Sequence, residues 1–199
     1  MTKICVCDGH SKGSPGTSGF LDEFEAANAY VKHIASALEA AGYDVVTVLD
    51  GPGNENAELA EKVEVANSSG CDWFLDVHFN SGGGTGTECY YWGGSEKGEK
   101  MARIMSANVA SALGIRDRGA KTGKFYVLRN TVMPAVLLET LFVDSKTDVE
   151  AWNSTSWDEL CGAIVDSFKG VIRTPGEDAT VPKASVLEND EYKVTIERK

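Results

Sequence analysis

The sequence lacks several features that would place the protein in a large functional class. In its 199 residues no apolar run approaches the ~20 residues that cross a bilayer, so no membrane partner is expected. The N-terminus, MTKICVCDGH, lacks the charged, then apolar, then small-residue order of a secretory signal, so a cytoplasmic location after synthesis is expected. Lys and Arg number 19 against 30 Asp and Glu, which leaves no basic footprint for nucleic acid.

Cysteine is present, but not in the arrangements that metal or disulfide chemistry requires. The five cysteines are odd in number and scattered, most of them among apolar residues, at positions 5, 7, 71, 89 and 161. Cys5 and Cys7 form a C-x-C pair, which differs from the C-x-x-C of a zinc ribbon or a redox site. We therefore expect buried reduced thiols rather than a disulfide framework.

What the chain does contain is an alternation of apolar runs and helical patterns. Hydrophobic residues make up 42%, which suits one domain with a buried core. Strands are expected at residues 3–7, 43–49, 73–78, 88–92, 125–128 and 135–141, and helices at residues 22–41, 55–67, 97–113 and 157–171. This alternation predicts an α/β fold with a mostly parallel twisted sheet and helices on both of its faces.

The composition changes after Arg173. Residues 174–185, TPGEDATVPKAS, are typical of a linker. Residues 186–199 are too few to bury a core, although EYKVTIER within them has a strand pattern. We expect a main domain over residues 1–173 and a C-terminal stub over 186–199. The stub is the start of a further domain, a strand that docks on the main domain, or a pairing element for a second chain.

Only three histidines are present, and two of them follow predicted strands. His10 comes just past the first strand, and His78 lies at the end of the strand in WFLDVHFN. Ligands of an open parallel sheet bind beyond the carboxyl ends of its strands, so both imidazoles are expected at the same edge. His33 lies on the polar side of its helix, where a solvated surface residue is expected.

Residues 73–80 place polar side chains on one face of a strand that should be buried on both. With a period of two, Asp76, His78 and Asn80 share a face with Phe74. Burying such groups without partners costs on the order of several kcal/mol, and a metal site supplies one partner. Asp76 either orients His78 or is a hydrogen-bonded strand residue, and Asn80 is either a turn residue or a substrate contact.

A catalytic metal usually has a third protein ligand, and two glutamates are candidates. On the helix at residues 22–41, Glu23 shares the sheet-facing side with Ala27 and Ile34. Glu25 lies on the wetter side with Lys32. The helix geometry therefore favours Glu23 as the third ligand.

A further carboxylate, Glu139, lies in the apolar run VLLETLF near the end of a predicted strand. An unpaired carboxylate is costly there, because burial disfavours its charge. Beside a metal-activated water it could act as general base and then as general acid. The alternative is that Glu139 is the buried partner of Arg129 or Arg103.

A resemblance to a known family rests on five segments, DGH, LDEFEAANAYVKHIASALEAAGYDV, LDVHFNS, GTECYYW and AVLLETLFVD. In this order, over residues 2–170, they resemble the zinc-dependent N-acetylmuramoyl-L-alanine amidases, and more narrowly the catalytic domains of phage endolysins. The resemblance implies one Zn²⁺ held by His10, Glu23 and His78, with Glu139 as the catalytic glutamate. Many family members carry Gly after the histidine and Arg after the second strand, where this chain has Ser11 and Lys12, and Asp50 and Gly51.

The resemblance also implies what the protein acts on. Such enzymes hydrolyse the amide bond between N-acetylmuramic acid and L-alanine in bacterial peptidoglycan, with a metal-bound water as nucleophile. A single catalytic domain, a linker and a wall-binding part fit the plan of similar endolysins, which act on the cell wall after release.

Two other functions could use this set of residues. A non-catalytic cell-wall-binding module on the same fold would need a defective site, and all four key positions carry suitable side chains. An iron oxygenase with two histidines and one carboxylate is permitted by the ligands, but the α/β alternation is a poor match for the usual β-rich scaffolds.

Overall fold

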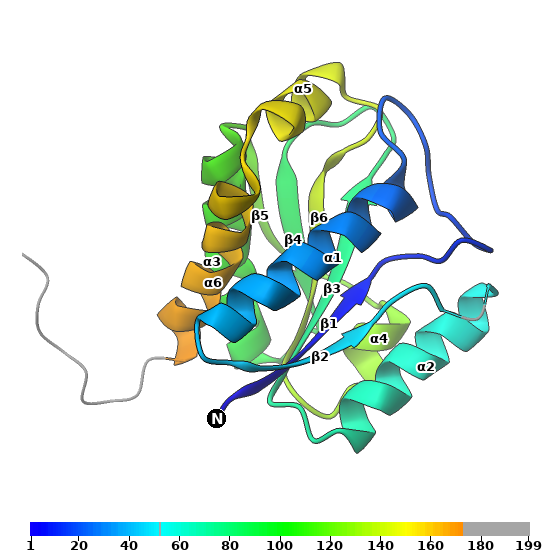
Figure 1. Ribbon diagram of the computed structural model, residues 1–199, viewed down its shortest axis with the longest axis vertical. Coiled ribbons are helices and arrows are strands. Elements are labelled where there is room, and N and C mark those ends of the chain that lie inside the picture. Colours follow the sequence, from blue (N-terminus) through cyan, green and yellow to red (C-terminus); the bar gives the residue numbers. More distant parts are fainter. Residues whose placement is uncertain (52, 173–199) are drawn as a thin grey trace, which may run out of the picture.

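This computed structural model describes residues 1–51 and 53–172 of the chain. A six-stranded sheet lies at its centre (Figure 1). Its strands are β1 (Lys3–Asp8), β2 (Asp44–Val48), β3 (Trp73–Asn80), β4 (Thr87–Tyr91), β5 (Asp117–Thr122) and β6 (Ala135–Phe142). They lie in the order β2-β1-β3-β6-β4-β5. β1, β2, β3 and β6 are mutually parallel, β4 is antiparallel to β6, and β5 is parallel to β4. The prediction of a mostly parallel sheet is confirmed.

Helices cover both faces of the sheet, also as predicted. They are α1 (Glu23–Ala40), α2 (Glu55–Ser68), α3 (Glu96–Leu113), α4 (Tyr126–Asn130), α5 (Lys146–Ser154) and α6 (Trp157–Ile172). α1, α3, α5 and α6 lie on one side of the sheet, and α2 and α4 lie on the other (Figure 1). The sheet therefore forms the middle of three layers.

Two apolar cores separate these layers, and the strands contribute alternate residues to them. Leu75 and Leu138 pack in the larger core, under α1, α3 and α6, whereas Phe74 and Leu137 pack in the smaller core, under α2 and α4. This is the period-two alternation that the sequence predicts for residues 73–80. The smaller core therefore lies on the face of the sheet that also carries Asp76, His78 and Glu139.

The start of α1 places an acidic residue at the edge of the sheet. Asp22 is the N-cap, and its side chain accepts a hydrogen bond of 3.0 Å from the backbone N–H of Glu25. The helix then presents Tyr30, Val31 and Ile34 to the core, and each is fully buried. Because the cap fixes where the helix begins, Glu23 lies in its first turn.

One predicted element is wrong and two were not predicted. Residues 125–128 were expected to form a strand, but most of them belong to helix α4, because so short an apolar run does not distinguish helix from strand. β5 has the sequence DRGAKT, a polar edge strand without apolar alternation. α5 has a weaker apolar stripe, and its clearest signal is the N-cap Ser145, which accepts a hydrogen bond from the N–H of Asp148.

Predictions about the cysteines, the membrane and the tail have separate outcomes. All five cysteines are buried and free, as expected. Within the described residues, no helix combines the length and the apolarity that crossing a membrane requires. The linker at residues 174–185 and the stub at 186–199 lie outside the described residues and stay predictions.

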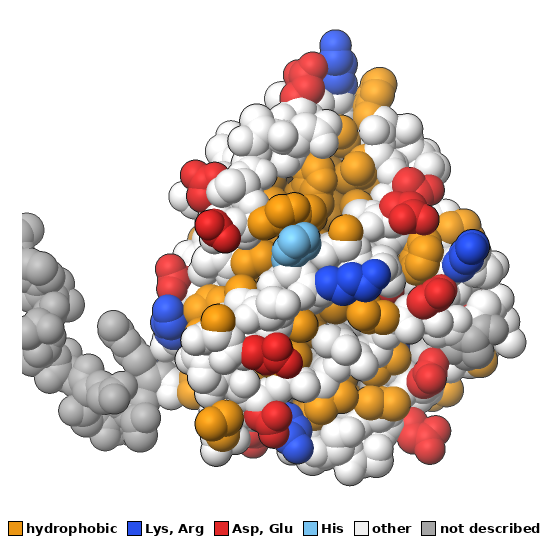
Figure 2. Space-filling view, in the orientation of Figure 1, with side chains coloured by type: hydrophobic (Ala, Val, Ile, Leu, Met, Phe, Trp, Pro, Cys, Tyr) orange, Lys and Arg blue, Asp and Glu red, His pale blue; other side chains and the backbone are white. Residues whose placement is uncertain are grey.

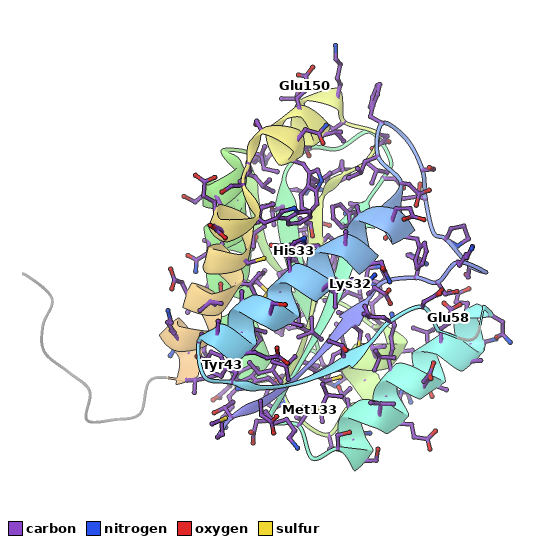
Figure 3. The ribbon with its side chains drawn as sticks, viewed as in Figure 1. Lys32, His33, Tyr43, Glu58, Met133 and Glu150 are labelled. Atoms are coloured by element: carbon purple, nitrogen blue, oxygen red, sulfur yellow. The ribbon has the colours of Figure 1, made fainter. Side chains whose placement is uncertain are left out.

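The surface charge agrees with the acidic composition. On the face shown in Figure 2, the described Lys and Arg side chains are separated by acidic and apolar ones and form no continuous basic patch. Helix α1 lies on this face, and Figure 3 labels its exposed residues Lys32 and His33.

The packing of the larger core predicts a large cost for truncating a central strand. Leu138 lies on β6, the strand between β3 and β4, and its side chain is fully buried. For Leu138→Ala we expect the free energy of unfolding, measured by urea denaturation, to fall by about 2–5 kcal/mol. The control is Val132→Ala, at a residue that is 82% exposed, which should stay within about 0.5 kcal/mol of the parent protein. Equal effects of the two changes would contradict this description of the core.

Candidate metal centre

Three side chains from separate segments meet at the carboxyl ends of β1 and β3. Glu23 Oε1 lies 3.2 Å from His10 Nε2 and 3.3 Å from His78 Nδ1. One ligand-type atom from each of the three residues lies within 4.8 Å of the other two. Among the residues that the structure describes, this is the one cluster of His, Cys, Asp and Glu that meets this criterion. The geometry brings together the three residues that the sequence suggested as metal ligands.

Backbone amides fix the carboxylate of Glu23. Oε1 accepts a hydrogen bond of 3.1 Å from the N–H of Phe79, and Oε2 accepts one of 3.0 Å from the N–H of Thr17. Glu23 is 3% exposed and Glu25 is exposed, as the helix-face argument predicts. Burial raises the pKa of Glu23, but hydrogen bonds from His10 and His78 outweigh burial and hold the pKa well below its usual range.

The imidazole of His78 is held on its other side by Asp76. Its Nε2 lies 3.2 Å from Asp76 Oδ2, and the Nζ of Lys62 donates a 3.0 Å hydrogen bond to Asp76 Oδ1. Burial alone would lower the pKa of His78, but the charge of Asp76 and its hydrogen bond outweigh this and raise the pKa to about 10. Acidic surroundings that favour a proton on this ring also favour a metal cation beside it.

Two glycines form a cradle that a side chain would fill. A Cβ atom at Gly9 would lie 2.5 Å from His78 Nδ1. A Cβ atom at Gly16, where φ is +74°, would lie 2.5 Å from Glu23 Oε2 and 2.5 Å from the His10 ring. The loop after β1 is glycine-rich here because its backbone approaches the three candidate ligands closely.

Glu139 lies beside this cluster on the neighbouring strand. It is the register partner of His78 on β3 and of Glu88 on β4. Its Oε2 is buried and has no hydrogen-bond partner among the described residues. Burial, together with the nearby carboxylates of Glu23 and Glu88, raises the pKa of Glu139 to about 7, against the opposing charge of His78.

The arginine partners considered for Glu139 lie elsewhere. Arg103 pairs with Glu99 at 2.6 Å on the surface of α3. Arg129 is exposed, and within the described part of the chain no ion pair joins it to Glu139. Among the described residues, the alternative that Glu139 is the buried partner of Arg129 or Arg103 is therefore not met.

The sequence analysis missed Glu88, whose environment contrasts with that of Glu139. Glu88 is 2% exposed and accepts hydrogen bonds from Arg118, Lys121, the Tyr90 hydroxyl and the Asn80 amide. Burial raises its pKa, but these donors outweigh burial and lower it to about 2. The side-chain amide nitrogen of Asn80 thus donates to Glu88, and the side-chain oxygen Oδ1 of Asn80 accepts from the N–H of Ser81 at 2.8 Å. Both ends of the Asn80 amide have protein partners.

A cleft of about 570 Å³ opens over the candidate centre. His10, His78 and Glu139 line it, together with Glu55 and Glu58 from α2 and the segment 124–127 at the start of α4. Figure 3 shows Glu58 on α2 beside the loop that follows β1, and this carboxylate accepts a hydrogen bond from Ser11. A larger hollow, of about 830 Å³, lies at the opposite edge of the sheet near Trp73, and none of the candidate site residues lines it.

His33 belongs to a different place. It is exposed on α1 (Figure 3). Its ring stacks on that of Trp157, with centroids 4.2 Å apart. The prediction of a surface histidine is confirmed.

Lys62 is a second residue that the sequence analysis missed. It lies on the buried side of α2 with Val63 and Ala66, so the helical period of the sequence could have identified it as a buried cation.

Comparisons with known proteins agree with this fold. The profile of the N-acetylmuramoyl-L-alanine amidase family matches residues 4–169. The N-acetylmuramoyl-L-alanine amidase CwlM of Bacillus licheniformis is 35% identical over 159 residues, which are 79% of this chain and 63% of that protein. The endolysin of Bacillus phage SPP1 is 34% identical over 157 residues, which are 74% of this chain and 58% of that protein. The chain thus spans less than two thirds of the length of either relative.

Two solved structures of similar fold are catalytic domains of other proteins. The catalytic domain of the N-acetylmuramoyl-L-alanine amidase CwlV from Bacillus (Paenibacillus) polymyxa var. colistinus superposes with a TM-score of 0.76 at 28% identity, covering 86% of this chain and 98% of that one. The catalytic domain of the CD27L endolysin gives a TM-score of 0.79 at 24% identity, covering 85% of this chain and 98% of that one. The second match speaks for the fold alone.

The glycine cradle gives a test of the candidate centre. Gly9→Ala should push the His78 ring away from Glu23, and we expect zinc affinity in a chelator competition to fall about tenfold or more. The matched control is Gly162→Ala in α6, where an added Cβ would meet nothing within 4 Å and should leave zinc affinity unchanged. Unchanged affinity in both variants would argue against metal binding at this place.

Proposed function

Because the chain belongs to the N-acetylmuramoyl-L-alanine amidase family, we propose that it is a zinc-dependent hydrolase of the amide bond between N-acetylmuramic acid and L-alanine in bacterial peptidoglycan. The observation that carries the proposal is the convergence of His10, Glu23 and His78 beside Glu139. An endolysin or autolysin role, in which the enzyme reaches the wall after release, goes with this proposal.

The donor set supports zinc as the metal. Two imidazole nitrogens and one carboxylate oxygen, with a position left for water, are a common ligand set of catalytic zinc. Two ligands that bind tetrahedral zinc at about 2.0–2.1 Å lie about 3.3 Å apart. The separations of 3.2 Å and 3.3 Å between Glu23 Oε1 and the two imidazole nitrogens fit this requirement.

The unpartnered oxygen of Glu139 supports its role as the proton carrier. Zinc in this centre would supply Lewis acidity, which polarises a carbonyl group and activates water. Glu139 accepts a proton from the attacking water as the water oxygen bonds to the carbonyl carbon of the muramoyl group. The C–N bond to L-alanine then breaks, and Glu139 donates the proton to the departing amine nitrogen. A carboxyl group with a pKa near 7 suits both transfers.

The cleft offers suitable surfaces for a polymeric substrate. Phe125 is 38% exposed and Tyr126 is 46% exposed, and both line the cleft with Lys124. Flat aromatic rings give sugar rings and peptide groups an apolar contact surface. Glu55 and Glu58 of α2 also line the cleft, so acidic side chains and the cation of Lys124 are both available to a substrate. Peptidoglycan is the partner that we propose for this cleft.

Glu139→Gln tests the mechanism. The change keeps the shape of the side chain and removes its ability to accept a proton, so we expect unchanged zinc content and a fall in amide cleavage of at least about 100-fold. Mass analysis of digested cell walls measures the reaction, with new N-terminal alanine as the product of the active protein. The control, Glu25→Gln, changes an exposed glutamate on α1 and should cleave normally.

Two results would contradict this assignment. Retained cleavage in Glu139→Gln would remove Glu139 from the mechanism. New reducing sugar ends, without new N-terminal alanine, would show that a glycosidic bond is cut instead.

Metal removal is a separate test. A chelator should abolish cleavage, and added Zn²⁺ should restore it, while Glu23→Gln should lower zinc content because it removes an anionic ligand. Metal analysis of the purified protein separates zinc from iron. Sedimentation with cell walls that releases no soluble fragments, even with zinc bound, would instead indicate a non-catalytic wall-binding module.

A further inference from the structure

A chain of three buried polar side chains connects helix α2 to the candidate metal centre. Lys62 is 3% exposed, and its Nζ donates a 3.0 Å hydrogen bond to Asp76 Oδ1. Asp76 is fully buried, and its other oxygen, Oδ2, lies 3.2 Å from His78 Nε2. The ammonium group thus lies behind the carboxylate that contacts a candidate ligand.

The stability of the fold does not account for this lysine. A buried ammonium group loses its hydration, and a buried ion pair often contributes no more stability than two apolar side chains of similar size. Lys62 lies with Val63 and Ala66 on the buried side of α2, and these two apolar residues belong to the smaller core. An apolar residue would fit the composition of this core, so the cation at position 62 requires another explanation.

The chain of hydrogen bonds determines which nitrogen of His78 faces the metal centre. A neutral imidazole carries one N–H, and an ionised carboxylate can only accept. With Nε2 donating to Asp76, the free electron pair lies on Nδ1, which is 3.3 Å from Glu23 Oε1. If Asp76 turned away, His78 would lose both its orientation and the preference for this tautomer.

We propose that Lys62 is a positioning residue that acts through Asp76 to present Nδ1 of His78 to the metal. Lys62 holds one oxygen of Asp76 so that the other oxygen stays aimed at Nε2 of His78 and accepts from it. This inference rests on the proposed zinc site, and it assigns a role to a residue on a helix that supplies none of the three candidate ligands.

The test measures zinc affinity and stability separately. Lys62→Met should weaken zinc binding about 10- to 100-fold in a chelator competition. It should also alter the visible absorption spectrum of the Co²⁺-substituted protein, which reports ligand geometry. Lys62→Arg, which keeps the positive charge, should recover part of the affinity. The control is Lys146→Met on α5, whose side chain is 73% exposed and pairs with Glu150, and which should bind zinc as the parent protein does.

A double variant separates positioning from a purely structural role. Lys62→Met combined with Asp76→Leu replaces the buried pair by apolar side chains, so the metal-free protein should regain thermal stability. Zinc affinity should stay 10- to 100-fold low, because His78 then has no acceptor for Nε2–H. Recovery of zinc affinity together with stability would overturn the inference. This variant also keeps the test valid if Lys62→Met alone does not fold.

Failure of this inference is distinguishable from failure of the proposed function. A parent protein that binds no zinc and cleaves no peptidoglycan would contradict the zinc amidase itself. A parent protein that binds zinc, with Lys62→Met binding it equally tightly and with the same Co²⁺ spectrum, would contradict only the role of Lys62.

Discussion

The carboxylate of Glu23 is the constraint on which the rest of this edge of the molecule depends. It is buried and ionised, a state that is costly unless several donors or cations compensate the charge. The structure supplies two backbone N–H groups and two imidazoles: His10 and the N–H of Thr17 come from the loop after β1, and His78 and the N–H of Phe79 come from the end of β3. The helix cap at Asp22, the glycine-rich loop after β1 and the end of β3 must therefore all be in place before the carboxylate can be buried.

The sheet topology explains why so many carboxylates gather near this centre. Parallel β1, β3 and β6 end at the same edge, so His10, His78 and Glu139 lie close together although they are far apart in sequence. Antiparallel β4 brings Glu88 beside Glu139. The two neighbouring glutamates differ in the hydrogen bonds that they accept. Glu88 accepts from several donors, whereas Glu139 Oε2 accepts from none among the described residues. The distribution of donors, rather than burial alone, determines where a proton can reside.

The sequence predicted several side chains whose polarity conflicts with their expected burial, and it missed elements whose residue pattern is not distinctive. Polar residues on one face of a buried strand and a glutamate in an apolar run pointed to His78 and Glu139, and the helix period distinguished Glu23 from Glu25. β5 gave no such signal, since a polar edge strand resembles a loop. The helical state of α4 could not be read from four apolar residues. Lys62 is likewise a charged residue on the buried side of α2, but its partner Asp76 lies on another element, and sequence periodicity does not give contacts between elements.

The departures from the family pattern at Ser11, Lys12 and Asp50 belong to one structural arrangement. Ser11 is fully buried and donates to Glu58, which ties the loop after His10 to helix α2. The N–H of Lys12 donates a 3.0 Å hydrogen bond to Asp50 Oδ1, and the N–H of Asp50 donates to Asp8 on β1. Asp50 adopts a positive φ of 50°, which an Asp side chain tolerates better than most. These hydrogen bonds therefore join the loop that carries His10 to helix α2, to Asp50 and, through Asp50, to the end of β1. Replacing Asp50 by Ala would remove the acceptor of the Lys12 N–H, and with it one of the hydrogen bonds that hold the loop two residues after His10.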